Sequence, residues 1–218
     1  MALIKWYIYT YLYVFSLIAF AGILQKAIKI STETSRKLIH ILLSFTWMFL
    51  YRFFWKSWQI IVIPITFIII NWISYKTKLF KMIERESSDD NHKGTIYFAI
   101  AITLLMCCAL VFPQTILATG IATFCLCFGD GFAALFGSLF KRRIWIRKNK
   151  SVQGSLFCIL GASIGLIIFS LMLGLSMPWY LIVILSIVTA LFELVGKGYD
   201  NFSIIAGIYI LASLLINI

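Results

Sequence analysis

The chain has 218 residues, of which 62% are hydrophobic and 12% charged, and its mean hydropathy is +0.99. A water-soluble domain needs about 25% charged residues, so this composition excludes an ordinary soluble protein. It predicts an all-α, polytopic integral membrane protein with a single transmembrane domain over residues 1–218. The net charge of +11 does not indicate nucleic-acid binding, because membrane topology accounts for it.

A helix that crosses a bilayer core of about 30 Å needs about 20 apolar residues. Eight segments meet this requirement: 3–25, 38–54, 58–75, 95–112, 114–140, 153–174, 178–195 and 202–217. The sequence therefore predicts a bundle of about eight transmembrane helices, with seven as the alternative count. The fifth segment is too long for one straight span. We expect it to break or kink at Gly129-Asp130-Gly131, because glycine loosens a helix and aspartate cannot face lipid.

Basic residues are distributed unequally between the two sides of the membrane. With eight alternating spans, sixteen of them fall on one side, in loops 26–37, 76–94, 141–151 and 196–201. Three fall on the other side: Lys5, Arg52 and Lys56. The positive-inside rule makes the first side cytoplasmic and places both termini outside. The expected location is the cytoplasmic membrane of a prokaryote or the endoplasmic reticulum of a eukaryote.

The acidic residues lie on the same side or near the ends of spans there: Glu33, Glu84, Glu86, Asp89, Asp90, Asp130, Glu193 and Asp200. Lysine and arginine neutralise phosphate and carboxylates hold Mg2+, so this face suits a polyphosphate substrate with a divalent metal. For loop 76–94, ordinary solvated loop charges are an equally good interpretation. For Asp130 and Glu193 that interpretation is weaker, because an ionisable group within apolar sequence is costly and usually functional.

One motif lies at the start of the second predicted span, where Arg36 and His40 are four residues apart and share a helix face, beside Lys37. A histidine in this position is about as often structural as catalytic. A second motif contains Glu86 and leads into Gly94-Thr95-Ile96-Tyr97.

A third motif joins the glycine-flanked Asp130 to the turn Lys150-Ser151-Val152-Gln153-Gly154. This turn opens the sixth predicted helix, whose N-terminal amides favour a phosphate. It is not a Walker A loop, because the required glycine spacing is missing. Finally, Glu193 and Asp200-Asn201 bracket the last cytoplasmic turn with carboxylates and an amide.

At these motifs the chain resembles the CTP-dependent lipid-alcohol kinases, which include dolichol kinase, phytol/farnesol kinase and the CTP-dependent diacylglycerol kinase. The resemblance covers a kinase-like core over about residues 31–205, with the first span (1–30) peripheral to it. It implies Mg2+-dependent transfer of the γ-phosphate of CTP to the hydroxyl of a membrane lipid alcohol at the cytoplasmic face. In that family the stretch matching Asp130 to Gly154 is the CTP-binding and catalytic region.

The expected roles follow from the motifs and this resemblance. The expected catalytic residues are Asp130, Lys150 and Asp200, with Asp130 and Asp200 as the Mg2+ ligands. Expected nucleotide and phosphate contacts are Arg36, Lys37, Gly129, Gly131, Lys150, Ser151, Gly154 and Asn201. Secondary candidates are His40, Glu86, Gln153 and Glu193.

Two departures from the family pattern bear on these roles. Gln153 stands where the family usually has glutamate, and Lys141 replaces a common glycine. One alternative function is a phosphatidate cytidylyltransferase-like enzyme. Another is a non-catalytic lipid-binding or transport relative, which Gln153 favours. Polyprenol, phytol, farnesol and diacylglycerol are all candidate acceptors, because they differ mainly in their apolar tails.

Overall fold

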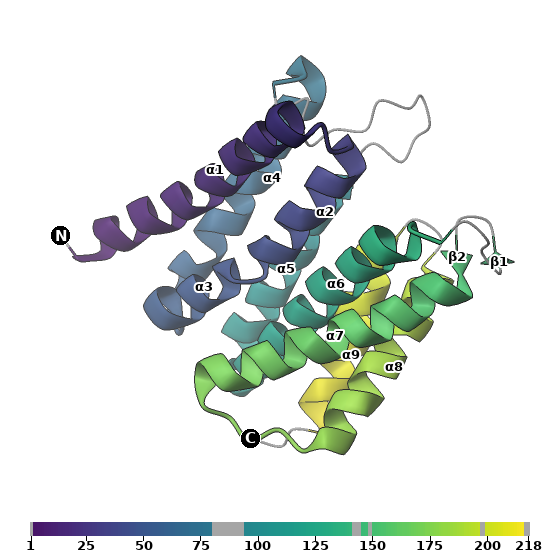
Figure 1. The fold of residues 1–218 in the computed structure, drawn as a ribbon. Coiled ribbons are helices and arrows are strands. Elements are labelled where there is room, and N and C mark those ends of the chain that lie inside the picture. Colours follow the sequence, from purple (N-terminus) through teal and green to yellow (C-terminus); the bar gives the residue numbers. More distant parts are fainter. Residues whose placement is uncertain (1, 80–93, 141–144, 148–149, 197–198, 216–218) are drawn as a thin grey trace. The chain divides into compact units, whose positions relative to one another are not determined.

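The computed structural model describes residues 2–79, 94–140, 145–147, 150–196 and 199–215. Most of these residues form helices, and the one sheet among them is a two-stranded hairpin, so the all-α prediction is confirmed for the described part of the chain. The chain divides into two compact units, an N-terminal unit (Met1–Ile116) and a C-terminal unit (Leu117–Ile218), whose elements are labelled in Figure 1. Each unit is described separately, and the interpretation of residues 1–218 as one domain stays a prediction.

The N-terminal unit contains five α-helices and two short 3-10 turns. In chain order these are α1 (Ala2–Ile28), α2 (Thr32–Leu43), α3 (Thr46–Phe54), η1 (Trp58–Ile61), α4 (Val62–Thr77), α5 (Gly94–Val111) and η4 (Pro113–Thr115). A turn at residues 44–45 separates α2 from α3, so the second predicted span consists of two consecutive helices. Ser31 caps α2, where its hydroxyl accepts a hydrogen bond from the Thr34 amide.

Tyrosine hydroxyls join α1 to the rest of the N-terminal unit. Tyr7 donates to the Gln59 carbonyl at 3.3 Å, Tyr11 to the Thr66 hydroxyl at 2.9 Å and Tyr13 to the Leu42 carbonyl at 2.8 Å. A phenol group within apolar surroundings is stable only where its hydroxyl has a partner. The tyrosines of the first span therefore fix α1 against α2, η1 and α4.

The C-terminal unit contains four helices and the hairpin. These are α6 (Ile116–Gly137, whose first residue belongs to the N-terminal unit), β1 (Trp145–Arg147), β2 (Lys150–Ser151), α7 (Val152–Leu173), α8 (Trp179–Val195) and α9 (Asp200–Leu215). The strands pair antiparallel, with Trp145 opposite Ser151. The end of α6, the start of α7, the end of α8 and the start of α9 all lie at the hairpin end of this unit (Figure 1).

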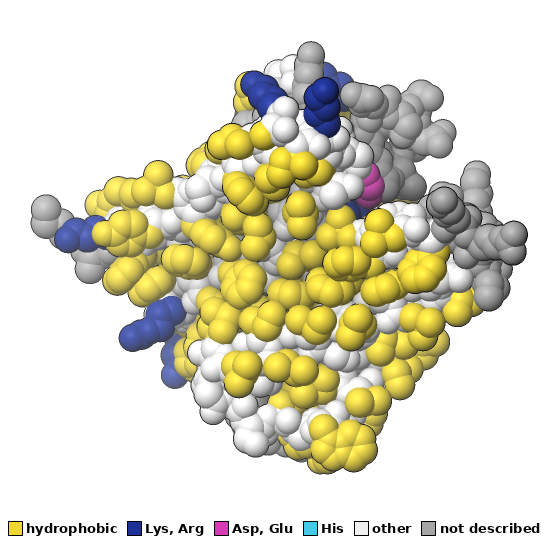
Figure 2. Space-filling model, viewed as in Figure 1, with side chains coloured by type: hydrophobic (Ala, Val, Ile, Leu, Met, Phe, Trp, Pro, Cys, Tyr) yellow, Lys and Arg dark blue, Asp and Glu magenta, His cyan; other side chains and the backbone are white. Residues whose placement is uncertain are grey.

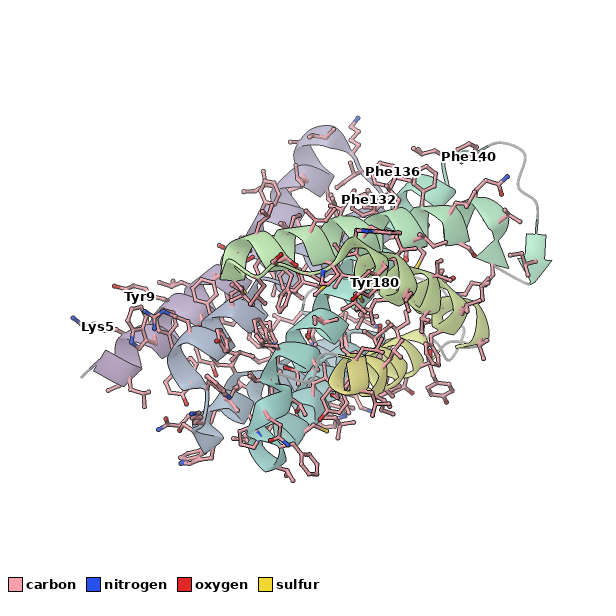
Figure 3. All side chains as sticks on the ribbon, turned by 90° about the horizontal axis from the view of Figure 1, so that it is seen from below. Lys5, Tyr9, Phe132, Phe136, Phe140 and Tyr180 are labelled. Carbon is pink, nitrogen blue, oxygen red and sulfur yellow. The ribbon has the colours of Figure 1, made fainter. Side chains whose placement is uncertain are left out.

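Glycines allow α6 and α7 to approach closely along their length. A Cβ atom on Gly137 would lie 2.8 Å from the Gly154 Cα atom, and one on Gly161 would lie 2.5 Å from the Phe128 carbonyl oxygen. Small residues at such positions let helix backbones pack tightly where lipid gives no hydrophobic driving force. Aromatic rings complete this contact, with Phe136 and Phe140 5.5 and 5.8 Å from the Phe157 ring; Figure 3 labels both.

Each of the eight predicted spans overlaps the helical segments of the structure. Six helical stretches are long and apolar enough to cross a membrane: Leu3–Ile28, Thr32–Phe54, Trp58–Thr77, Gly94–Val111, Pro113–Gly137 and Val152–Leu173. The helices α8 and α9 are also apolar but have only 17 and 16 residues. Figure 2 shows hydrophobic side chains over much of the visible surface, as membrane insertion requires. The count of eight spans and the orientation of the termini stay predictions.

Of the predicted break or kink at Gly129-Asp130-Gly131, the break is wrong, because α6 is one continuous helix from Ile116 to Gly137, and the kink stays a prediction. A break is unnecessary because the Asp130 side chain does not face lipid: the residue is buried, with 9% of its surface exposed. Gly129 serves packing here. A Cβ atom at this position would lie 2.9 Å from Thr189 Cγ2 and 3.1 Å from Cys158 Sγ. The glycine therefore brings α7 and α8 against α6 beside the aspartate.

The replacement Gly161→Ala tests the α6–α7 contact. Alanine is the better helix former, yet its Cβ would press on the Phe128 backbone, and we expect a loss of about 1–3 kcal/mol in the free energy of unfolding. Denaturant unfolding in detergent measures this change. The control is Leu156→Ala on the exposed face of α7, which should cost less; equal or greater stability of Gly161→Ala would refute the close contact.

Candidate functional site

Four charged side chains converge at the hairpin end of the C-terminal unit. They are Asp130 from α6, Lys150 from β2, Glu193 from α8 and Asp200 from α9, and we call them the acid–lysine cluster. Three of the four acidic residues that the structure describes meet here, although their sequence positions span 70 residues. The folding of the unit thus brings together groups that the sequence separates.

The Lys150 ammonium joins two of the carboxylates. It donates a hydrogen bond to Glu193 Oε1 and another to Asp200 Oδ2, the latter at 2.9 Å. One carboxylate oxygen from each of Asp130, Glu193 and Asp200 lies within 4.8 Å of the others. Ionised carboxylates at such distances repel one another, and a shared cation such as the Lys150 ammonium relieves this repulsion.

The cluster is largely withdrawn from solvent. The side chains of Glu193 and Lys150 are 8% and 14% exposed, and that of Asp200 is 22% exposed. Burial lowers the pKa of Lys150, but the Glu193 and Asp200 carboxylates raise it more, so its pKa lies above the usual lysine value of 10.5. Lys150 is therefore a cation at neutral pH and cannot act as a proton acceptor there. The cluster therefore combines three carboxyl groups with one ammonium.

The local sequence explains why Lys150 points into the cluster. Ser151 is the N-cap of α7 and has extended backbone dihedrals, and its hydroxyl accepts a hydrogen bond from the Gly154 amide at 3.2 Å. Because Ser151 is the cap, α7 begins at Val152, and Lys150 belongs to strand β2 just before the helix. The contact between Gly137 and Gly154 then holds this junction against the end of α6.

The chemistry of the cluster fits a divalent metal with a preference for oxygen ligands. Asp130, Glu193 and Asp200 each offer one carboxylate oxygen. Asp200 Oδ1 is buried and has no hydrogen-bond partner among the residues that the structure describes, which leaves an acceptor for a cation. Mg2+ binds such oxygens at about 2.1 Å, so two ligands of one ion lie at most about 4.2 Å apart. The three carboxylate oxygens would therefore have to move only slightly closer together to bind Mg2+.

The structure also places the other predicted residues of the C-terminal unit. Gly129 and Gly131 are buried within α6, one on each side of Asp130. Gln153 is half-buried in the first turn of α7, and Asn201 follows Asp200 at the start of α9. Ser151 and Gly154 form the helix cap and lie directly after Lys150. Their roles in nucleotide binding stay predictions.

The predicted residues of the N-terminal unit form a separate group on α2. Arg36 Nη2 contacts the two carboxylate oxygens of Glu33 at 2.7 and 2.9 Å, and a Cβ atom on Gly94 would lie 3.2 Å from Arg36 Nη1. The His40 ring packs 4.5 Å from Phe98. The motifs around Arg36 and Gly94 are thus adjacent, as neighbouring parts of one site require. Lys37 lies beside Arg36 in α2, and Glu86 lies outside the described residues.

Glu193 has a more central place in the acid–lysine cluster than the amino-acid sequence suggested. We expected Asp130 and Asp200 as the metal ligands and ranked Glu193 as secondary, whereas the structure places all three carboxylates together. The signal in the sequence was an acidic residue inside an otherwise apolar helix.

No family model, no curated protein and no solved structure matches this chain. Membership of the lipid-alcohol kinase family therefore stays a prediction.

The replacement Lys150→Met tests the electrostatic role of the lysine. It leaves two largely buried carboxylates without their cation, and we expect a loss of about 3 kcal/mol in the free energy of unfolding without added metal. The pKa of Lys150 is raised in the folded state, so this advantage of the wild type is present below about pH 10.5 and is lost as the pH rises through the folded-state pKa.

Denaturant unfolding of both proteins between pH 7 and the alkaline range measures this difference. The double variant Lys150→Met/Glu193→Gln should recover part of the loss, because it removes one of the unpaired charges. Equal stability of the wild type and Lys150→Met at neutral pH would contradict the ion pairs seen here.

Proposed function

We propose that this protein transfers the γ-phosphate of CTP to the hydroxyl of a membrane lipid alcohol, with Mg2+, at the cytoplasmic face of the membrane. One observation carries this proposal: the acid–lysine cluster gathers three carboxylates and an ammonium at one end of a unit built from apolar helices. Charged groups at the end of such helices lie near the lipid headgroups, where a lipid hydroxyl and a water-soluble nucleotide can meet.

Phosphoryl transfer depends on positioning and charge neutralisation more than on covalent chemistry by the protein. Asp130, Glu193 and Asp200 would hold Mg2+, which supplies charge neutralisation at the phosphates when bound. Asp130 is the more buried of the two aspartates and comes from α6, against which α7 and α8 pack beside Gly129. We assign it the leading role, as metal ligand or as the base that accepts the proton of the lipid hydroxyl.

The remaining residues supply positive charge and amide donors. Lys150 stays protonated and can pair with a phosphate oxygen, and the N-terminus of α7 after Ser151 favours an anion. Arg36 and Lys37 on α2 belong to the N-terminal unit, and their contact with the phosphates stays a prediction from the sequence. The Arg36 guanidinium is oriented by Glu33, and its buried Nε has no hydrogen-bond partner among the described residues, so a donor is left for a ligand.

The acceptor is proposed to be a lipid because the cluster adjoins apolar helix surface. Leu156 and Leu160 on α7 are exposed within two to three turns of Ser151, and Leu139 is exposed just after α6. An alcohol with a long apolar tail could lie against such surface while its hydroxyl reaches the headgroup level. The aliphatic side chains place no demand on the tail structure, so the alcohol can be a polyprenol, phytol, farnesol or diacylglycerol.

A non-catalytic lipid-binding or transport role is the second candidate, and Gln153 favours it. Glutamine retains hydrogen bonding but lacks the negative charge of the glutamate usual in the lipid-alcohol kinases. In such a protein the acid–lysine cluster would be a structural ion-pair network. A binding measurement with CTP, made with and without Mg2+, distinguishes the two candidates, because only the kinase requires Mg2+-dependent binding of CTP.

The replacement Asp130→Asn tests the proposed reaction. It removes one negative charge with little change in shape, and we expect phosphate transfer to fall below detection while expression persists, because Asp130 would hold the metal or accept the proton. Transfer from labelled CTP by purified protein is the measurement, with Lys76→Met on the exposed end of α4 as the control that keeps wild-type activity. Retained transfer by Asp130→Asn would remove this residue from the catalytic role.

The nucleotide product separates the kinase from a cytidylyltransferase. A kinase breaks the bond between the β- and γ-phosphates and releases CDP, whereas a cytidylyltransferase acting on phosphatidate releases pyrophosphate. We expect CDP and a phosphorylated lipid in equal amounts. Chromatography of the nucleotides and an assay for pyrophosphate after one incubation decide the matter; pyrophosphate with a CDP-linked lipid would replace the kinase assignment with the transferase.

A further inference from the structure

The spacing of the acid–lysine cluster is compatible with an ammonium ion as its internal cation. Hydrogen bonds of about 2.9 Å that leave one nitrogen in tetrahedral directions place their acceptors about 4.7 Å apart. The carboxylate oxygens of Asp130, Glu193 and Asp200 lie within 4.8 Å of one another. Six-coordinate Mg2+ would require ligand oxygens no more than about 4.2 Å apart. The Lys150 ammonium, which already bonds Glu193 and Asp200, therefore fits the cluster without contraction, whereas a metal ion would draw the oxygens closer together.

A metal ion and the ammonium would need the same carboxylate groups. Lys150 donates hydrogen bonds to Glu193 and Asp200, two of the three carboxylates that a metal ion would use. In a site with little solvent, a metal ion bound to these carboxylates would repel the Lys150 ammonium strongly. The cluster therefore accepts either the ammonium or the metal.

Of the groups involved, Lys150 is the one that can move. The three carboxylates are on α6, α8 and at the start of α9, so their positions follow those of packed helices. Lys150 is in the two-residue strand β2 before the α7 cap, and its side chain is a flexible four-carbon stem. It can leave the carboxylates by rotation of its own side chain without moving a helix.

We propose that Lys150 is an exchangeable internal cation: it neutralises the cluster without metal, and it leaves Glu193 and Asp200 when a divalent cation binds. This inference rests on the metal site of the proposed function and concerns how that site is regulated. The released ammonium becomes available to a nucleotide phosphate beside the α7 N-terminus. Lys150 thus joins nucleotide binding to metal binding, because the lysine reaches the phosphate only after the metal has replaced it.

The first experiment measures Mn2+ binding to the full-length protein in detergent, without nucleotide or lipid alcohol, at constant ionic strength. Electron paramagnetic resonance of free Mn2+ gives the dissociation constant for the wild type, Lys150→Met and the control Lys76→Met. We expect at least about tenfold tighter binding by Lys150→Met, because no ammonium has to be displaced, and wild-type binding by Lys76→Met. Equal or weaker binding by Lys150→Met overturns the inference.

The second experiment detects the displacement directly in the wild type and needs no variant to fold. An amine-acylating reagent modifies free lysines, and mass spectrometry follows the rate at Lys150 and at the exposed Lys76 with and without Mg2+. We expect Mg2+ to increase the rate at Lys150 several-fold and to leave Lys76 unchanged. An unchanged or slower rate at Lys150 means that the lysine stays on its carboxylates, which overturns the inference.

Transfer of phosphate from CTP, measured on the same preparations, separates the two proposals. Metal-dependent release of Lys150 without any transfer would support the exchange and refute the kinase assignment. Transfer without release of Lys150 would support the kinase and refute the exchange.

Discussion

Two hydrogen bonds from one ammonium, from Lys150 to Glu193 and to Asp200, make the charged end of the C-terminal unit stable. Three acids withdrawn from water would repel one another, and burial of an uncompensated carboxylate is costly. The lysine allows the ends of α6, α8 and α9 to meet where their sequences place carboxylates. Any binding at this end must either use that ammonium or replace it.

Close packing of the helices next to the acid–lysine cluster determines where its charged side chains lie. Gly129 brings Thr189 and Cys158 close to α6, and Gly137 and Gly154 bring the start of α7 against the end of the same helix. These contacts fix Asp130 and the Ser151 cap relative to each other within one unit. Positions held by helix backbones suit a reaction that depends on the placement of charges, because small displacements weaken catalysis steeply.

Much of this arrangement could be predicted from the sequence, for identifiable reasons. The lengths of the apolar segments located the helices. The Lys150-Ser151 turn located the start of α7, because capping of a helix by serine is a local signal. The continuity of α6 through Asp130 could not be predicted, since glycine and aspartate give the same local signal whether they face lipid or protein. The central place of Glu193 depends on contacts between residues 43 positions apart, which no local pattern contains.

The central claim is that the acid–lysine cluster serves phosphate transfer to a lipid. The most direct measurement incubates the purified protein with CTP labelled at the γ-phosphate and a panel of lipid alcohols, with ATP in parallel, and follows the label into the lipid fraction. We expect Mg2+-dependent labelling of at least one alcohol from CTP, and we expect a chelator to abolish it. Label that stays in the nucleotide with every alcohol and both nucleotides would contradict it.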